Sequence, residues 1–206
     1  MHNKLVYLGL YYFRYFHHVP CSLFLPNNVQ KVFYHSLIKQ LRTGEEREQL
    51  DAAYALGSEP VVSELIDLLP DESVGRYAAY ALGASDATVV PALTEALADP
   101  DDTVRANAAY ALGDIGSPAQ TATHQLARAL TDDSAPVRRN AAEALGNIGP
   151  DAKESVPALI QALQDDDQDI RWNAAEALGN IGPGAKESVP ALIQALQDDG
   201  WNVRRN

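Results

Sequence analysis

Few side chains in this 206-residue sequence could carry out nucleophilic, acid–base or metal chemistry. It contains one cysteine, Cys21, and five histidines, four of which come before residue 36. A nucleophile needs a positioned base beside it, and the remaining histidine, His124, stands alone in its segment. His17 and His18 are adjacent, so on a helix or strand they would not converge on one ion. We therefore expect no catalytic residue, no metal site and no cofactor.

Charged side chains are plentiful, but they recur at a fixed interval. Four arginines and four aspartates repeat with a spacing of 33 residues: Arg105, Arg138, Arg171 and Arg204, with Asp99, Asp132, Asp165 and Asp198. A catalytic pair would break such a period. We instead predict a ladder of ion pairs between neighbouring repeats, each contributing about 0 to 1 kcal/mol if exposed.

The charge is distributed unevenly along the chain. The first 44 residues contain five basic residues and no acid, whereas the rest contains 11 basic and 28 acidic residues, a net charge of −17. This acidic field repels nucleic acid and anionic membranes. No run approaches the roughly 20 apolar residues of a membrane span. A single cysteine forms no internal disulfide, so a cytoplasmic protein is expected.

Residues 1–30 differ from the remainder in composition, being basic and rich in aromatic residues. The opening stretch has the apolar run of a secretory signal, but Arg14 interrupts it and no small-residue cleavage pattern precedes Cys21. We expect residues 1–30 to be an aromatic cap over the first repeat or a leader. Residues 31–206 then form the second region, a repeat array.

Self-similarity is the strongest signal in the sequence. The segment Asn140–Asp166 recurs at Asn173–Asp199 with one change, Asp151 to Gly184. Five Ala-Ala pairs and six similarly spaced leucines extend the pattern back to about residue 32, with shorter loops in the early copies. The leucines are Leu41, Leu69, Leu97, Leu130, Leu163 and Leu196.

Each repeat reads as two helices. At 100° per residue, Val104, Ala108 and Leu112 share one face, and Val156 and Leu163 share another in the following segment. Paired glycines, at 113 and 116, 146 and 149, and 179 and 182, are typical of helix ends. Such hairpins must stack to bury their apolar faces. We therefore predict an all-α, right-handed α-solenoid of about five hairpins plus a partial terminal repeat.

The string V-R-x-N-A-A-x-A-L-G-x-I-G followed by V-P-A-L-x-x-A-L-x-D, as in residues 137–165, resembles the HEAT-like repeat first recognised in phycobilisome bilin lyases. The resemblance covers about residues 33–206. It implies an α-solenoid whose second helices line the concave side. It also implies a protein-binding scaffold, since only a minority of such proteins are bilin lyases or parts of enzymes.

Deoxyhypusine hydroxylase is similar to this repeat, and it binds two irons through His-Glu dipeptides placed after the Val-Arg pair. This sequence has Arg139-Asn140 and Trp172-Asn173 at two of those positions, and it contains no His-Glu dipeptide. Neither arginine nor a neutral amide replaces imidazole and carboxylate around iron. The di-iron activity is therefore excluded.

The same helical arithmetic points one set of second-helix side chains into the groove. The candidate binding residues are Lys39, Glu64, Asp67, Glu95, Arg128, Gln161 and Gln194. Together with Asp132, Asp165 and other aspartates at the helix ends, they make the middle of the groove largely acidic. We expect a protein partner with a basic patch, steered by charge and weakened by salt.

Two further surfaces are possible contact sites. Tyr54, Tyr80 and Tyr110 recur at one first-helix position, which predicts an exposed stripe on the convex side or rings packed between adjacent first helices. At the other end, Leu192 and Leu196 should be partly uncovered. The sequence is then part of a longer array, or this end associates with another copy of the chain.

The function expected from these features is a non-catalytic scaffold that binds a partner protein through its acidic groove. Two alternatives remain open from the sequence. One is a bilin lyase or chromophore-handling subunit, which would need apolar and basic groups in the groove. The other is a regulatory repeat fragment of a larger enzyme.

Overall fold

The computed structural model describes residues 27–56 and 61–205. The predicted cap or leader over residues 1–30 lies outside these ranges, except at its end, and stays a prediction. The described residues form helices and turns and contain no strand. The predicted all-α repeat solenoid is therefore confirmed.

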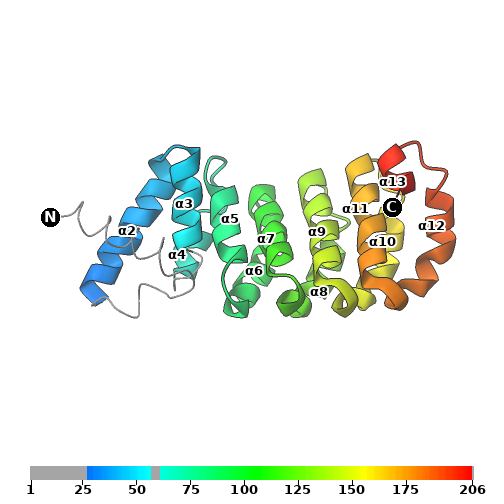
Figure 1. The fold of residues 1–206 in the computed structure, drawn as a ribbon, viewed down its shortest axis with the longest axis horizontal. Helices are drawn as coiled ribbons and strands as arrows, with labels where there is room; N and C mark the ends of the chain where they lie inside the picture. Colours follow the sequence, from blue (N-terminus) through cyan, green and yellow to red (C-terminus); the bar gives the residue numbers. More distant parts are fainter. Residues whose placement is uncertain (1–26, 57–60, 206) are drawn as a thin grey trace. The chain divides into compact units, whose positions relative to one another are not determined.

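The helices follow the predicted order of one leading helix, five hairpins and a partial helix (Figure 1). The first helices of the hairpins are α3 (Glu46–Leu56), α5 (Gly75–Gly83), α7 (Asp102–Ile115), α9 (Ala135–Ile148) and α11 (Gln168–Ile181). The second helices are α4 (Val62–Ile66), α6 (Val90–Ala96), α8 (Thr123–Ala129), α10 (Val156–Ala162) and α12 (Val189–Ala195). The leading and partial helices are α2 (Asn27–Thr43) and α13 (Trp201–Arg205).

The chain divides into two compact units, Met1–Asp86 and Ala87–Asn206. In the first unit, α2 packs against α3, and both α3 and α4 pack against α5. Leu37, Leu56 and Leu65 are fully buried between these helices. The apolar stripes of the early repeats therefore form a core of their own.

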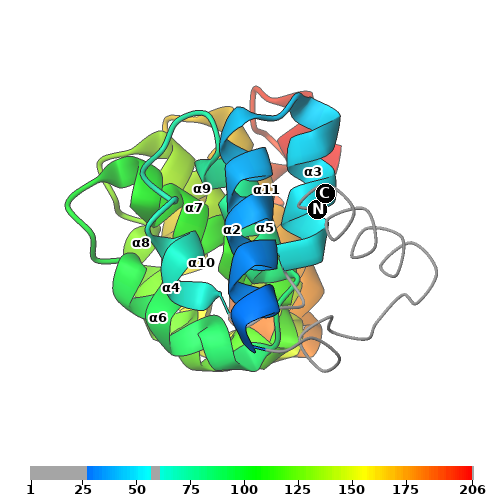
Figure 2. The same cartoon turned by 90° about the vertical axis from the view of Figure 1, so that its left-hand side faces the viewer.

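In the second unit, α7, α9 and α11 pack side by side in one row. Figure 2 looks along this row and shows α6, α8 and α10 on one side and α7, α9 and α11 on the other. We call these the second-helix side and the first-helix side. The core lies between them and includes Leu112, Leu126, Leu145 and Leu159, all fully buried.

The two glycines at the end of each first helix have different roles, which corrects the expectation that both end the helix. Gly149 follows α9 with φ of +72°, a left-handed conformation that glycine adopts without strain. Gly146 lies inside α9, where a Cβ would stand 3.1 Å from Ala177 Cα of α11. Gly146 is therefore required for the close approach of α9 and α11.

A 3₁₀ segment precedes each of the last three second helices, a feature that the sequence pattern did not predict. These segments are η3 (Ser117–Ala122), η4 (Gly149–Ser155) and η5 (Gly182–Ser188). In η4, Ala152 and Ser155 are buried, and Ser155 Oγ donates to Thr123 O of α8 at 3.3 Å. The connecting turn is thus part of the packing between repeats. A shorter 3₁₀ turn, η2 (Ala87–Val89), precedes α6.

Candidate functional site

The arginine ladder predicted from the 33-residue spacing is present in the second unit. Each guanidinium reaches the aspartate of the next repeat through Nε: Arg105 to Asp132, Arg138 to Asp165 and Arg171 to Asp198, all at 2.8 Å. A second nitrogen, Nη2, completes each pair at 2.8 to 3.1 Å. We use "arginine ladder" for these three pairs.

Each ladder arginine also fixes the turn before its own helix. Nη1 of Arg138 donates to Asp132 O at 2.9 Å and to Asp133 O at 3.2 Å. The Asp165 carboxylate meanwhile accepts the backbone N–H of Asp167 at 2.9 Å. One residue pair therefore connects two successive turns, which explains why its position in the repeat is fixed.

The ladder changes the titration of its carboxylates. Hydrogen bonds from Arg105 hold the pKa of Asp132 below its usual range, although partial burial acts in the opposite direction. Burial alone would raise the pKa of Asp165, but the hydrogen bonds from Arg138 and from the Asp167 N–H outweigh it and leave the pKa lowered. These aspartates are therefore charged at neutral pH.

A hollow of about 430 Å³ opens on the second-helix side beside the ladder. Its wall is formed by the turn after α8, the first turn of α9, helix α10 and the turn after α10. Four aspartates, one arginine and two glutamines contribute to the lining: Asp132, Asp133, Asp165, Asp166, Arg138, Gln161 and Gln164. We call this site the aspartate hollow.

The charge in the aspartate hollow is only partly neutralised. Arg105 and Arg138 engage Asp132 and Asp165, which are mostly buried. Arg138 also reaches Asp166 at 3.2 Å, but the Asp166 side chain is 94% exposed. Asp133 is likewise exposed to solvent. The hollow thus presents accessible carboxylates above a rigid base of ion pairs.

All seven predicted groove residues are exposed in the structure. Lys39, Glu64 and Asp67 belong to the first unit, where Glu64 accepts a hydrogen bond from Ser63 Oγ at 2.8 Å. Glu95 on α6, Arg128 on α8, Gln161 on α10 and Gln194 on α12 belong to the second unit. Among these seven, Gln161 lines the aspartate hollow.

Sequence reasoning missed the turn residues Asp133 and Asp166 as members of this site. A signal for them exists, because an Asp-Asp pair recurs at 132–133, 165–166 and 198–199. The helical arithmetic covers only residues within a helix. It could not show that Asp133 and Asp166 line the same hollow as Gln161.

The tyrosines predicted either to form an exposed stripe or to pack between first helices are partly covered in the structure. Tyr80 and Tyr110 are half-buried, and the Tyr110 hydroxyl hydrogen-bonds the carboxylate of Asp114 one turn away. The Tyr54 side chain lies outside the described residues. The physical reason is that α7 packs closely against α9, so a ring pointing away from its own core stripe is still partly covered by the adjacent first helix.

The outer face of α12 is apolar and exposed, as expected for Leu196. Val189 is 51% exposed, Ile193 61%, Leu196 56% and Trp201 of α13 58%. The corresponding residues of α10, Val156 and Leu163, are buried. Identical sequence is therefore covered in one repeat and uncovered in the next.

Two general properties of the described residues bear on function. No group of three or more His, Cys, Asp or Glu side chains in the described part of the chain is placed to hold a metal ion. No helix among those residues is both long and apolar enough to cross a membrane.

The fold and the repeated hairpins define an α-helical repeat scaffold. Comparison with protein families agrees, because the HEAT repeats family matches residues 59–136 and 122–206. The chain therefore belongs to the HEAT repeat family. None of the curated proteins matches it.

Solved structures with similar folds include both natural and designed proteins. The complex of CpcE and CpcF of phycocyanin lyase from Nostoc sp. PCC7120 matches with a TM-score of 0.62 and 25% identity, over 70% of this chain and 94% of that chain. An engineered protein matches with a TM-score of 0.56 and 25% identity, over 84% of this chain and 92% of that chain. A designed armadillo repeat protein in complex with peptide (KR)4 matches with a TM-score of 0.58 and 20% identity, over 98% of this chain and 94% of that chain.

Proposed function

We propose that this chain is a protein-binding scaffold that takes a basic segment of its partner on the second-helix side. The aspartate hollow is the observation that carries the proposal. It presents the exposed carboxylates of Asp133 and Asp166 beside the paired Asp132 and Asp165. The region from residue 45 onward has a net charge of −17. Such a field favours encounter with Lys- and Arg-rich segments.

The repetition of the sequence supports a partner that extends over more than one repeat. Residues 158–166, which include most of the hollow's α10 wall, recur unchanged at 191–199. Asp198 and Asp199 engage Arg171 as Asp165 and Asp166 engage Arg138. Neighbouring repeats thus present the same groups, and an extended chain with repeated basic residues suits such an arrangement.

The designed armadillo protein adds support of a limited kind. Its structure contains the peptide (KR)4, so a helical repeat fold of this type can receive a chain of alternating lysine and arginine. This makes (KR)4 a suitable first probe for the present chain, with glutamine in place of every basic residue as a neutral control peptide.

Fluorescence anisotropy with labelled (KR)4 tests the proposal. We expect saturable binding that weakens as salt rises from 50 to 300 mM, because exposed charges are screened. The double variant Asp133→Asn/Asp166→Asn should weaken binding about fivefold or more, since it removes two accessible carboxylates and leaves the ladder aspartates in place.

The matched control changes the same charge elsewhere. Glu154→Gln/Glu187→Gln alters one exposed glutamate in each of η4 and η5, neither of which lines the aspartate hollow. It should leave binding unchanged. Equal losses in both double variants, or binding that is insensitive to salt, would overturn the proposed site.

A second candidate function is participation in a phycocyanin-type lyase. The similarity to the CpcE and CpcF complex favours it. A bilin carries propionates and would need basic and apolar groups, whereas the aspartate hollow contains mainly carboxylates. An absorbance band that develops on mixing the chain with bilin and a phycobiliprotein would support this candidate, and an unchanged spectrum would exclude it.

We also propose that the apolar face of α12 mediates self-association. Val189, Ile193 and Leu196 are exposed there, whereas the same residue types in α10 are largely covered by packing. Burying such a face is favourable in proportion to its apolar area. A second copy of the chain is the partner that this part of the proposal specifies.

A further inference from the structure

A second hollow, of about 410 Å³, lies on the first-helix side between α9 and α11. It is separate from the groove proposed above. Its lining includes one tryptophan, three carboxylates, an amide and an arginine: Trp172, Glu143, Asp169, Glu176, Asn173 and Arg139. We call this site the tryptophan hollow.

The tryptophan hollow lies where the internal repeat is broken. Residues 140–166 and 173–199 are identical except at one position. The stacking of successive repeats accounts for this shared set of side chains. Asp169 and Trp172 fall just before the second copy, at positions where the preceding repeat has Pro136 and Arg139. The repeat packing therefore does not account for an aspartate and a tryptophan here.

A second substitution in the repeat opens space at the same place. Glu143 of α9 occupies the position that Tyr110 fills in α7. The Tyr110 ring is half-buried and bonded to Asp114, whereas the exposed Glu143 carboxylate lines the hollow. A bulky ring is thus replaced by a flexible acid beside the space that Trp172 borders.

The chemistry of the lining selects a cation with a flat face. The half-buried Trp172 presents an indole to the hollow, and Trp is the aromatic residue that attracts a cation most strongly. Glu143, Asp169 and Glu176 supply three carboxylates. A guanidinium can stack on the indole and donate several hydrogen bonds in its plane, which an ammonium cannot do.

Asn173 adds a buried polar group to this lining. It is 5% exposed, and the hydrogen bond from its Nδ2 to Arg139 O is long, at 3.5 Å. The corresponding bond from Asn140 to Ala106 O measures 2.9 Å. No other hydrogen bond of the Asn173 side chain exists within the described residues, so its amide oxygen is available to accept from a donor in the hollow.

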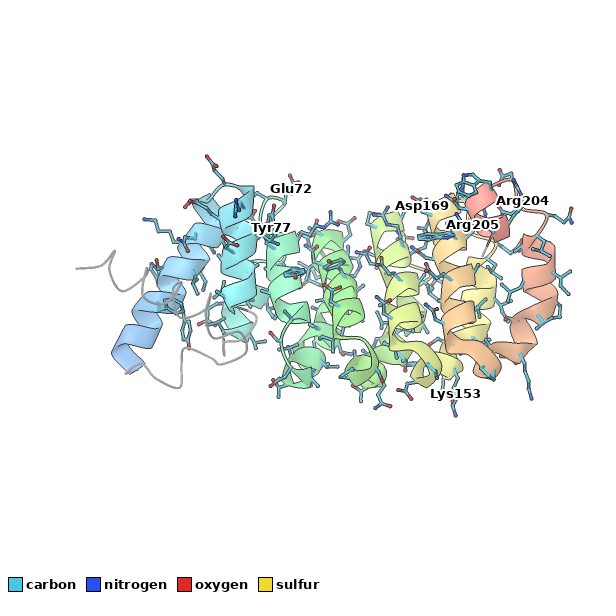
Figure 3. The ribbon with its side chains drawn as sticks, in the orientation of Figure 1. Glu72, Tyr77, Lys153, Asp169, Arg204 and Arg205 are labelled. Atoms are coloured by element: carbon cyan, nitrogen blue, oxygen red, sulfur yellow. The ribbon has the colours of Figure 1, made fainter. Side chains whose placement is uncertain are left out.

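The chain's own Arg139 does not neutralise the site. Its Nη1 is 4.0 Å from Asp169 Oδ2, and both side chains are about half exposed or more. Figure 3 shows Asp169 near the start of α11, at the same edge of the unit as Arg204 and Arg205 of α13. Arg139 therefore engages one rim carboxylate, while Glu143 and Glu176 remain for another cation.

The same kind of contact already occurs within this chain. In α13, the guanidinium carbon of Arg205 lies 5.8 Å from the centre of the Trp201 ring. That distance is within the range of a cation–π interaction. An arginine over a tryptophan is thus compatible with the surface of these first helices.

We propose that the tryptophan hollow binds an arginine side chain presented by a protein partner. This surface is distinct from the second-helix side, so the chain would contact its partners on two faces. The two contacts differ in chemistry, since the aspartate hollow accepts any basic residue through charge and the tryptophan hollow selects the planar guanidinium.

Nitrogen-15 NMR of the full chain tests this proposal through the indole N–H signals. The probe is N-acetylarginine amide, and N-acetylcitrulline amide is the uncharged control of the same shape. The Trp201→Phe variant assigns the Trp172 signal. Titration with the arginine probe should shift that signal to saturation, with at most a small shift from the citrulline probe.

Two double variants decide whether the hollow itself is responsible. Glu143→Gln/Glu176→Gln should raise the Kd of the arginine probe about fivefold, whereas Glu154→Gln/Glu187→Gln should leave it unchanged. An equal response to both probes, no shift of the Trp172 signal, or unchanged affinity in the first variant would overturn the proposal. None of these outcomes depends on (KR)4 binding at the aspartate hollow.

Discussion

At the scale of single residues, each ladder arginine forms four or five hydrogen bonds. Arg138 forms a two-point ion pair with Asp165 and holds two backbone carbonyls of its own turn. The side chains of this pair are 15% and 10% exposed, so the contribution of about 0 to 1 kcal/mol that holds for an exposed pair does not apply to it. An ion pair at this depth is costly to break from one side.

Replacing Arg138 should therefore destabilise the second unit. Arg138→Gln leaves the Asp165 carboxylate and the Asp132 carbonyl without their donor, and we expect a loss of about 2 to 4 kcal/mol in the free energy of unfolding. Urea denaturation followed by circular dichroism measures it. Arg139→Gln is the control, because among the described residues Arg139 forms one ion pair, the 4.0 Å contact with Asp169, and the change should alter stability by less than about 0.5 kcal/mol.

The ladder should also make stability depend on pH. The pKa values of Asp132 and Asp165 are lowered in the folded chain, so their contribution is present above the unfolded value of about 3.9. It is lost as the pH falls through the lowered folded values. The difference in urea midpoint between wild type and Arg138→Gln should therefore shrink as the pH falls below about 4, and a constant difference would contradict this.

At the scale of helices, the packing of α9 against α11 depends on Gly146, the inner glycine of α9. A Cβ on Gly146 would lie 3.1 Å from Ala177 Cα and 3.3 Å from its Cβ. Gly179 occupies the same position one repeat later, and a Cβ there would meet nothing within 4 Å. The same residue in the same local sequence thus has two different surroundings.

These surroundings give opposite effects for one substitution. Gly146→Ala should cost about 1 to 3 kcal/mol of unfolding free energy, because the helices must separate. Gly179→Ala should be neutral or stabilise by up to about 1 kcal/mol, because alanine favours helix over glycine. Thermal and urea unfolding of both variants measure this, and equal destabilisation would show that glycine is required by the helix itself.

The sequence could predict these helices and the ladder because both follow from a period. Apolar positions such as Val104 and Leu112 indicate which face of a helix is buried. A spacing of 33 residues places an arginine and an aspartate at the same positions of successive repeats, although it does not show which arginine meets which aspartate. The sequence could not show that Gly146 and Gly149 have different roles. Both are compatible with a helix end, and only the position of the neighbouring helix shows that one of them lies within it.

The candidate sites were less accessible from the sequence for a related reason. The direction of Gln161 follows from its own helix, so its position on the second-helix side could be predicted. No such helical rule gives the direction of the Asp166 side chain, because Asp166 lies in a turn. The tryptophan hollow arises from Trp172 and Glu143 on two different helices, and its volume depends on the distance between them.

At the scale of the whole molecule, the exposed face of α12 should determine the oligomeric state. We expect the sedimentation coefficient to rise with concentration, because Val189, Ile193 and Leu196 are exposed. Ile193→Asp/Leu196→Asp should weaken self-association by about tenfold or more, since it places charge in an apolar contact. A monomer for wild type across all concentrations would contradict the proposal.

The central claim is that a basic partner segment binds on the second-helix side. Photo-crosslinking tests it most directly, with benzoylphenylalanine placed at Gln161 in the aspartate hollow or at Glu154 in η4, and with labelled (KR)4 as the ligand. We expect a crosslinked product for position 161, reduced by high salt, and little product for position 154. Efficient crosslinking at 154 with none at 161 would contradict it.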